Sequence, residues 1–385
     1  GPSEPPIMTP MEPPWVWPRA AYVHVPFCAH RCGYCDFVTV VGRRGEHAGY
    51  VDALLAELEL ERPLLAEGVE TLYLGGGTPT FTKPAELGRL LAALPRAEEL
   101  TVEANPETVT ADLAELLARN RVNRVSLGAQ SFRTASLDVL ERRARPGDVR
   151  RAVHLLRGAG IDNISLDLLY GIPGQSAADL DRDLAEALAL GPEHLSCYVL
   201  EAKPGTRFTF AHGDELVRQA EAMEGYFEQV VETLVAAGYR WYETSSFCRA
   251  GRRARHNLGY WRGEDYLGIG IGAVSTVDGL RWRNRPQLAG YLGALAAEGR
   301  PPRAEEPLEP EVVHRERLML GLRLDEPVAL TRVEGVVDGA ALVRMEQLGL
   351  AERRRGGIVL TRRGRFLGGG VTVELMAESP AKSTI

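Results

Sequence analysis

Short apolar runs alternate with longer helical patterns from residue 20 to about residue 248, and this alternation constrains the fold more than any other feature. Seven runs are predicted as buried strands: AAYVHV (20–25), TLYLGG (71–76), ELTVEA (99–104), RVSLGA (124–129), NISLDLLY (163–170), HLSCYVL (194–200) and RWYETSSF (240–247). The predicted helices include YVDALLAELELERPLL (50–65), PAELGRLLAAL (84–94), TADLAELLA (110–118), DVRRAVHLLRGAG (148–160) and AADLDRDLAEALAL (177–190). Repeated βα units form a parallel sheet, so the pattern predicts an α/β fold, a complete or partial TIM-like (β/α) barrel.

The pattern also divides the chain. Residues 1–19 are proline-rich and are predicted to be an expression tag and a disordered N-terminus, followed by the barrel at 20–250. Residues 251–304 are predicted to extend the barrel and lead into a linker, since PPRAEEPLEPE (301–311) is rich in proline and acid. Helical patterns and the short run GIVL (357–360) then predict a small winged-helix-like domain at 305–375, with a tail at 376–385.

Composition limits the partners and the compartment. A net charge of −7 argues against a nucleic-acid partner. No apolar run approaches the roughly 18 residues of a spanning helix, and no secretory leader is present, so we expect a cytoplasmic protein. Three of the five cysteines are clustered, a distribution that favours a reducing compartment and a metal site over a disulfide scaffold.

The cysteine cluster lies in HVPFCAHRCGYCDF (24–37), where Cys28, Cys32 and Cys35 have the spacing C-x3-C-x2-C. Thiolates this close can hold one corner of a [4Fe–4S] cluster, and three ligands leave the fourth iron open to an exchangeable group. A zinc site completed by His24 or His30 is an alternative that the spacing leaves open. The other two cysteines, Cys197 and Cys248, are predicted to be small core residues.

Two further features follow the cysteines along the chain. The second predicted strand ends in LGGGTPT (74–80), whose glycines either let the backbone approach a ligand or form a tight turn. Polar residues stand at or near the ends of later predicted strands: Glu103, Gln130 and Asp167. Since strand C-terminal ends face the active site of a barrel, we expect these side chains to line one pocket.

CAHRCGYC after a first strand and GGGTP after the second resemble the radical S-adenosylmethionine (SAM) superfamily. The resemblance implies a [4Fe–4S] cluster on Cys28, Cys32 and Cys35, with SAM on the open iron. In that superfamily an electron from the cluster cleaves SAM and gives a 5′-deoxyadenosyl radical. SAM would therefore occupy the place of the absent fourth cysteine.

Within the superfamily, the chain most resembles the coproporphyrinogen-oxidase-like branch. The resemblance runs from about Tyr22 into the C-terminal part. It rests on the segments YVHVPFC, GGGTPT, VEANPE, LGAQSF, DLLYGIPGQ and LGIGIGAVS. It implies that Tyr22 lies beside the sulfonium, Tyr34 near the cluster, Asp167 on the ribose and Val274 on the adenine. The full implied SAM set is Tyr22, Tyr34, Gly76, Gly77, Thr78, Glu103, Gln130, Arg142, Asp167 and Val274.

Two departures from the oxidase pattern point to a subgroup. Asp36 stands where the oxidase has a further cysteine, and RHNLGYW (255–261) contains an HNxxYW signature, His256, Asn257, Tyr260 and Trp261, similar to heme chaperones of the HemW type. The resemblance implies a protein that binds the cluster, SAM and heme and delivers heme to respiratory hemoproteins. It also suggests a flavodoxin-like electron donor, a homodimer and peripheral association with the inner face of the membrane.

The chemistry of HNxxYW is compatible with two interpretations. His256 suits axial ligation of heme iron, the aromatic residues suit a porphyrin face, and Arg252, Arg253 and Arg255 suit its propionates. Alternatively, the segment is a turn that packs its aromatics on the barrel, with His256 satisfied by hydrogen bonds. His24 is a competing ligand, for which we expect a buried histidine bonded to backbone.

Other functions stay open from the sequence. An oxygen-independent coproporphyrinogen III oxidase would decarboxylate its substrate through SAM chemistry. A radical methyltransferase or cyclopropanase of the same branch would use a second SAM. Whether the chain is an enzyme is therefore undecided at this level.

Overall fold

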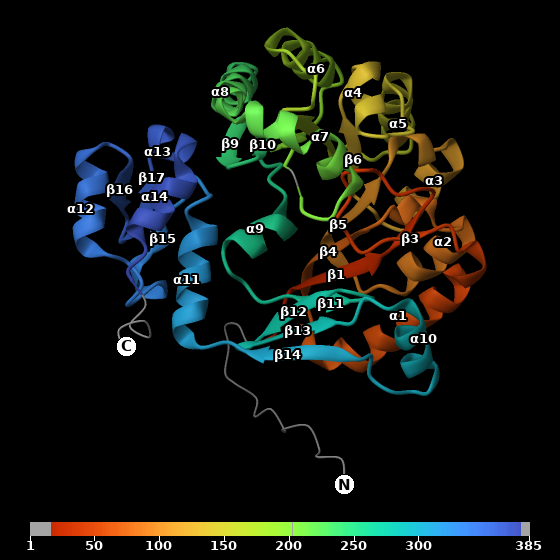
Figure 1. Ribbon diagram of the computed structural model, residues 1–385. Coiled ribbons are helices and arrows are strands. Elements are labelled where there is room, and N and C mark those ends of the chain that lie inside the picture. Colours follow the sequence, from red (N-terminus) through yellow and green to blue (C-terminus); the bar gives the residue numbers. More distant parts are fainter. Residues whose placement is uncertain (1–16, 202, 379–385) are drawn as a thin grey trace.

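The computed structural model describes residues 17–201 and 203–378 (Figure 1). The predicted tag and N-terminus therefore lie outside the described residues except for 17–19, and so does the predicted tail beyond residue 378. Within the described ranges, no helix combines the length and apolar character needed to cross a membrane.

A nine-stranded sheet organises the larger part of the chain, in the order β11-β1-β4-β5-β6-β7-β8-β10-β9. Its parallel strands are β1 (Ala20–Val25), β4 (Val69–Gly76), β5 (Ala97–Ala104), β6 (Arg124–Gln130), β7 (Ile164–Tyr170), β8 (His194–Val199) and β11 (Leu267–Ile269). The edge strands β11 and β9 form no pairing with each other in the described chain, so the sheet is an open arc. This confirms the α/β class and the partial barrel.

The last predicted strand is two strands. RWYETSSF forms β9 (Arg240–Glu243) and β10 (Ser246–Cys248), which pair antiparallel. A side chain bonds back across the turn, because Trp241 Nε1 donates to Thr244 O at 3.1 Å. This turn therefore folds one apolar run back on itself. The apolar content of the run alone does not indicate the turn.

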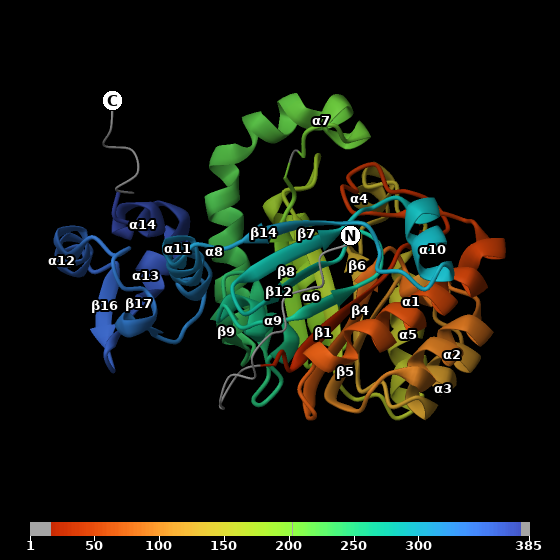
Figure 2. The same ribbon diagram turned by 90° about the horizontal axis from the view of Figure 1, so that it is seen from below.

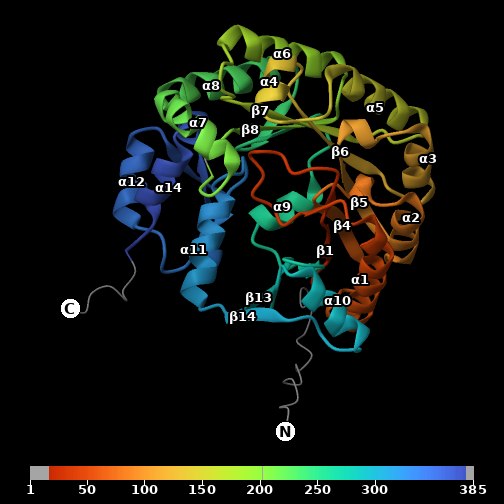
Figure 3. The ribbon, with the colours of Figure 1, turned by 45° about the vertical axis from the view of Figure 1, so that its right-hand side comes forward.

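Helices cover the convex side of the arc (Figure 3). They are α1 (His47–Glu61), α2 (Pro84–Ala93), α3 (Ala111–Arg119), α5 (Pro146–Gly158), α6 (Ala177–Ala189) and α8 (Ala220–Ala236), with α4 (Thr134–Val139) and α7 (Arg207–Arg218) at the strand ends. Local signals fix two starts, since Thr110 caps α3 and Ser176 forms a capping box with Asp179 at α6. Leucines of α1, α2, α3, α5, α6 and α8 and residues of the strands form one continuous core.

The concave side holds short elements from the predicted barrel extension, which the sequence analysis did not divide into helices and strands (Figures 1 and 3). They are the short helix α9 (Arg255–Trp261), the sheet of β12 (Val274–Val277), β13 (Leu280–Asn284) and β14 (Arg303–Pro307), and, at its margin, α10 (Leu288–Ala296). The predicted linker at 301–311 needs correction, because β14 pairs antiparallel with β13 over its full length. The short 3-10 helices are Arg44–Glu46, Arg62–Leu64, Pro79–Phe81, Pro106–Thr108 and Leu330–Arg332.

A separate C-terminal unit begins at α11 (Pro310–Gly321) (Figure 2). It continues through β15 (Val328–Ala329), α12 (Gly339–Gln347), β16 (Ala351–Arg354), β17 (Gly357–Leu360), α13 (Arg362–Phe366) and α14 (Gly368–Leu375), with sheet order β15-β17-β16. Leu318, Ile358 and Leu375 belong to its own buried core. Helices around a small hairpin sheet agree with the winged-helix-like prediction. The Arg365 guanidinium lies 3.7 Å from the Trp241 ring centroid and ties the unit to the barrel.

Candidate cluster and cofactor site

The three clustered cysteines lie on one loop at the carboxyl end of β1. Cys28 ends β2 (Phe27–Cys28), which pairs with β3 (Val40–Val41), and Cys32 and Cys35 lie on the loop between them. All three are free thiols, and Cys35 N donates to Cys32 O at 3.1 Å. Burial raises the pKa of the Cys28 thiol, the hydrogen bond with Thr78 opposes that rise, and Cys35 and Cys32 add to it.

This donor set fits a cluster, since three soft ligands share one short loop. No three histidine, cysteine, aspartate or glutamate side chains in the described part of the chain are already arranged as a metal site. Ligation of a cluster by Cys28, Cys32 and Cys35 therefore stays a prediction.

The two histidines of the zinc alternative already have hydrogen-bond partners inside the protein. His24 Nε2 lies 2.8 Å from Val38 O and must donate there, so its Nδ1 accepts from Tyr22 Oη at 2.9 Å. Burial lowers the pKa of His24 to about 4. His30 Nε2 lies 2.8 Å from Glu141 O. The expectation of a buried His24 bonded to backbone is confirmed. His30 stays beside the cysteines, because its Nε2 atom also lies 3.9 Å from Cys32 Sγ.

The glycine run serves the packing of the cysteine loop. Gly76 has φ of 120°, and a Cβ there would lie 2.6 Å from the His24 ring. A Cβ on Gly77 would lie 2.3 Å from Pro26 O and 2.9 Å from Cys28 Sγ. The tight-turn interpretation therefore accounts for both glycines, and the same turn sets the backbone of Thr78 beside the first cysteine.

Polar side chains at the strand ends meet on the concave side, as predicted. Glu103 accepts from Tyr73 Oη at 2.7 Å and from Gly76 N at 3.2 Å. Asp167 accepts from Ser126 Oγ at 3.2 Å. Burial, and next the nearby Glu103 carboxylate, raise the pKa of Asp167 to about 7. Two interacting buried carboxyls can accept hydroxyl donors such as those of a ribose.

Gln130 and Arg142 also come together, around Gly128. A Cβ on Gly128 would lie 3.2 Å from both Gln130 Nε2 and Arg142 Nη2, and Arg142 donates to Gly128 O at 2.7 Å. Gln130 has φ of 65°, a left-handed conformation that is unfavourable for a glutamine.

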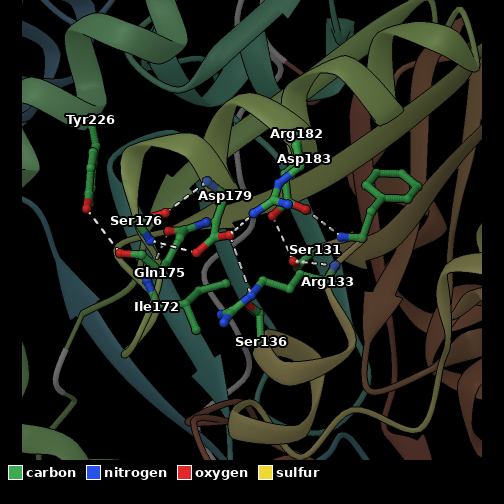
Figure 4. A network of polar contacts seen from close by, with 11 residues as sticks. Ser131, Arg133, Ser136, Ile172, Gln175, Ser176, Asp179, Arg182, Asp183 and Tyr226 are labelled. Carbon is green, nitrogen blue, oxygen red and sulfur yellow. Dashed lines mark hydrogen bonds and ion pairs between the residues drawn. The ribbon is translucent and has the colours of Figure 1, made fainter.

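The buried Asp183 of α6 holds the turn after Gln130 (Figure 4). Its carboxylate accepts from Ser131 Oγ at 2.7 Å and from Phe132 N at 2.8 Å. Those two bonds fix the backbone just beyond the strained residue.

The remaining predicted SAM residues flank this region. Tyr22 stacks on Tyr73 with ring centroids 6.1 Å apart. Tyr22 pairs in register with Gly268, which has no room for a Cβ because Val274 O would lie 2.2 Å away. Val274 is thereby placed near Tyr22. Tyr34 packs against the cluster of Leu140, Leu169, Ile172, Leu200 and Phe208 beside the cysteine loop.

The HNxxYW segment is a helix, α9, rather than a turn. His256 is 1% exposed, and its Nδ1 and Nε2 atoms lie 2.9 Å from Thr71 Oγ1 and 2.6 Å from Tyr260 Oη. Its ring stacks on Tyr73, with ring centroids 5.2 Å apart. Burial lowers the pKa of His256 to about 3. Both ring nitrogens are bonded inside the protein, which agrees with the interpretation in which hydrogen bonds satisfy His256.

Of the other members of the motif, Tyr260 bonds to His256, whereas Trp261 packs in a different place. Trp261 lies under the Arg323 guanidinium, 4.5 Å from its ring centroid, and packs on Leu258 and Leu324 at the junction with the C-terminal unit. Asn257 is partly exposed. The neighbouring arginines form ion pairs: Arg252 with Asp162, Arg253 with Glu326 and Arg255 with Glu98. The three arginines are therefore already paired with carboxylates, and a porphyrin surface on this motif stays a prediction.

Sequence reasoning missed several residues that build the site. Asn105 follows Glu103 within VEANPE, and Asp183 occupies a buried position of an amphipathic helix. A polar residue on a predicted apolar face was the available signal for Asp183. Nothing in the pattern distinguished Asn105, because its neighbours come from other strands and loops.

Comparisons with known proteins agree with this geometry. The Radical SAM superfamily model matches residues 22–187. The chain is 35% identical over 371 residues to the heme chaperone HemW of Mycobacterium tuberculosis, covering 93% of this chain and 95% of that protein. It is 32% identical over 379 residues to HemW of Bacillus subtilis, covering 94% and 100%. With HemW of Escherichia coli it shares 41% identity over 270 residues, covering 68% and 70%.

One solved structure shares the fold over most of its length. Coproporphyrinogen III oxidase (HemN) from Escherichia coli, a radical SAM enzyme, superposes with a TM-score of 0.78 at 22% identity, covering 93% of this chain and 90% of that one. At this identity the likeness concerns the fold alone.

Proposed function

The chain belongs to the HemW family of the radical SAM superfamily, and from this membership we propose that it is a heme chaperone. It binds a [4Fe–4S] cluster, SAM and heme, and it delivers heme to respiratory hemoproteins. The observation that carries the proposal is the identity with heme chaperones of two bacteria along nearly the whole chain.

Cys28, Cys32 and Cys35 would hold the cluster, and the polar side chains at the carboxyl ends of β4 to β7 would hold SAM. When bound, the two groups supply one-electron chemistry at the end of the sheet. The chain's own part is positioning. Tyr73 and the Gly76 amide fix the Glu103 carboxylate, and Ser126 orients Asp167. The predicted SAM contacts of Tyr22, Gln130, Arg142 and Val274 belong to this proposal.

Coproporphyrinogen III oxidation is the second candidate, and the shared fold is the observation that favours it. Asp36, exposed directly after Cys35, replaces the cysteine that the oxidase pattern has there. We therefore place oxidation, and a methyltransferase or cyclopropanase activity, behind the chaperone role. A flavodoxin-like electron donor, a homodimer and a position at the inner face of the membrane are further parts of the proposal that rest on the resemblance.

The test is an anaerobic heme titration of the reconstituted protein, followed by absorbance. The same preparation receives SAM, a reductant and coproporphyrinogen III. Saturable, stoichiometric heme binding without decarboxylated product is the expected result. Decarboxylated product with little specific heme binding would instead support the oxidase, and S-adenosylhomocysteine as product would support the methyltransferase. A variant with alanine at the three cysteines is expected to lose the brown colour of the cluster, and colour that survives would reject the ligand assignment.

A further inference from the structure

Two of the three clustered cysteines are connected through side chains from three separate segments. Cys28 Sγ lies 3.6 Å from Thr78 Oγ1, and Asn105 Nδ2 donates to the same hydroxyl oxygen at 2.9 Å. Arg142 Nη2 donates to Asn105 Oδ1 at 3.0 Å, and its Nη1 lies 3.7 Å from Cys32 Sγ. We call these five residues, Cys28, Thr78, Asn105, Arg142 and Cys32, the thiol network.

Donor chemistry gives the thiol network a direction. A guanidinium has no acceptor, so the oxygen of the Asn105 amide must face Arg142 and its nitrogen must face Thr78. The Thr78 oxygen accepts from Asn105, which leaves its single proton free to point at the Cys28 sulfur. A hydrogen-bond donor therefore reaches each of the two sulfurs, the hydroxyl at Cys28 and the guanidinium at Cys32.

Burial increases the energetic importance of these hydrogen bonds. Thr78, Arg142 and Cys28 are each less than a tenth exposed, so water does not replace a lost partner. A second bond, from Arg142 to Gly128 O at 2.7 Å, holds the guanidinium in place. The orientation of Asn105 is thus fixed from one side by a buried, anchored cation.

We propose that Asn105 is a positioning residue for the cluster, which orients the Thr78 hydroxyl as a donor to the Cys28 thiolate and thereby raises the reduction potential of the cluster. Hydrogen bonds to ligating sulfurs stabilise the more negative, reduced cluster, so they raise its potential. The inference rests on the proposed function, because it requires a cluster on Cys28, Cys32 and Cys35.

Two substitutions separate the orientation of the Thr78 hydroxyl from a purely structural role of these residues. Thr78→Val removes the hydroxyl at nearly constant volume, so the potential is expected to fall. Asn105→Asp keeps the acceptor for Arg142 but replaces the donor to Thr78 with an acceptor, so the threonine proton turns away from Cys28. The new carboxylate also lowers the potential through its charge, and this contribution is present with or without the Thr78 hydroxyl.

The experiment is a redox titration of the reconstituted, SAM-free protein, followed by electron paramagnetic resonance after iron content has been matched. A double-mutant cycle cancels the charge contribution, so Asn105→Asp is expected to shift the potential more in the unmodified background than in Thr78→Val. Thr78→Ser keeps the hydroxyl and is expected to restore the original potential. Thr80→Val is the control, because that buried hydroxyl bonds to Thr108 Oγ1 at 2.6 Å rather than to sulfur.

Equal shifts from Asn105→Asp in the two backgrounds would overturn the inference. So would a Thr78→Val potential equal to that of the Thr80→Val control. If Thr78→Val or Asn105→Asp fails to hold the cluster, the reduction potential of Thr78→Ser tests the inference. A potential below that of the unmodified protein would contradict a role for the hydroxyl, because Thr78→Ser keeps it. A reconstituted unmodified protein with no cluster would instead remove the proposed function, and this inference with it.

Discussion

The Nε2 atom of His256 lies 2.6 Å from the Oη atom of Tyr260, so the histidine and the tyrosine of the HNxxYW motif bond to each other. The barrel contains a second arrangement of the same kind. His194, which is fully buried, lies 2.8 Å from Ser165 Oγ through Nδ1 and 2.6 Å from Tyr242 Oη through Nε2. Two buried histidines with matching partners therefore lie on strand β8 and on helix α9, and the one on α9 belongs to the motif.

We expect His256→Ala to act on stability rather than on iron ligation. The substitution leaves the hydroxyls of Thr71 and Tyr260 without their partner, at a cost of about 1–3 kcal/mol in the free energy of unfolding. His194→Ala is the matched control and is expected to cost a similar amount. Urea denaturation measures the stability, and a heme titration of both variants measures the affinity.

The heme affinities of the two histidine variants are expected to agree. A loss of heme binding confined to His256→Ala, with a changed axial-ligand spectrum, would contradict this expectation. It would mean that His256 leaves Tyr260 or Thr71 when heme binds.

Gly76→Ala is expected to weaken SAM binding. Its positive φ is strained for alanine by about 1–3 kcal/mol, and the added carbon would meet the His24 ring. Relief of that contact moves the β4 turn and the Gly76 amide away from Glu103, so the SAM dissociation constant should rise roughly tenfold or more. Calorimetric titration with SAM is the measurement.

The control is Gly68→Ala, just before β4 and without a neighbour within 4 Å of the added Cβ. This variant should leave the SAM affinity unchanged. Equal SAM affinities for the two variants would refute the placement of SAM beside the β4 turn.

Asp183→Ala is expected to release the turn that carries Gln130. Two buried donors, Ser131 Oγ and Phe132 N, lose their acceptor, at about 1–3 kcal/mol each. SAM affinity should fall as the left-handed Gln130 relaxes.

The control for Asp183 lies one turn away on the same helix. Asp179→Ala removes a capping box at Ser176, at a cost of about 1 kcal/mol, without removing an acceptor of Ser131 or Phe132. A parallel loss of stability in both variants, with SAM affinity unchanged in each, would limit Asp183 to a structural role.

Glu57 is expected to make stability depend on pH. Its carboxyl accepts from Gly270 N at 2.7 Å, Asn284 Nδ2 at 2.7 Å and Tyr291 Oη at 2.9 Å. Burial nevertheless raises its pKa from 4.5 to about 7. The folded state therefore favours the protonated form. Stability from this group is complete below pH 4.5 and is lost as the pH rises through about 7.

Glu57→Gln is expected to flatten the fall in unfolding free energy between pH 5 and pH 8. The pKa shift corresponds to on the order of 3 kcal/mol, at about 1.4 kcal/mol per unit. Urea denaturation at several pH values measures the slope, and the difference between variant and parent cancels other titrating groups such as Asp167. Glu59→Gln, on the exposed side of the same helix, controls for the loss of a carboxylate. A slope unchanged by Glu57→Gln would reject the assignment.

The sequence by itself determined the βα order, the clustered cysteines and the polar strand ends, because each depends on local periodicity or spacing. The strands β1, β4, β5, β6, β7 and β8 and the helices α1, α2, α3, α5 and α6 follow from apolar period and capping, which neighbouring residues decide. Glu103 and Asp167 could be assigned to one pocket because parallel strands bring their carboxyl ends to one edge.

Tertiary structure decided which nitrogens, oxygens and sulfurs are free. His256 looked like an open ligand in HNxxYW, yet Thr71 and Tyr260 occupy both its ring nitrogens. Asn105 carried no signal, yet it lies between Arg142 and Thr78. Thr71 and Asn105 are both far in sequence from the groups they bind. A buried polar atom almost always has a hydrogen-bond partner. Whether such an atom is free to bind a ligand therefore depends on residues that only folding brings near it.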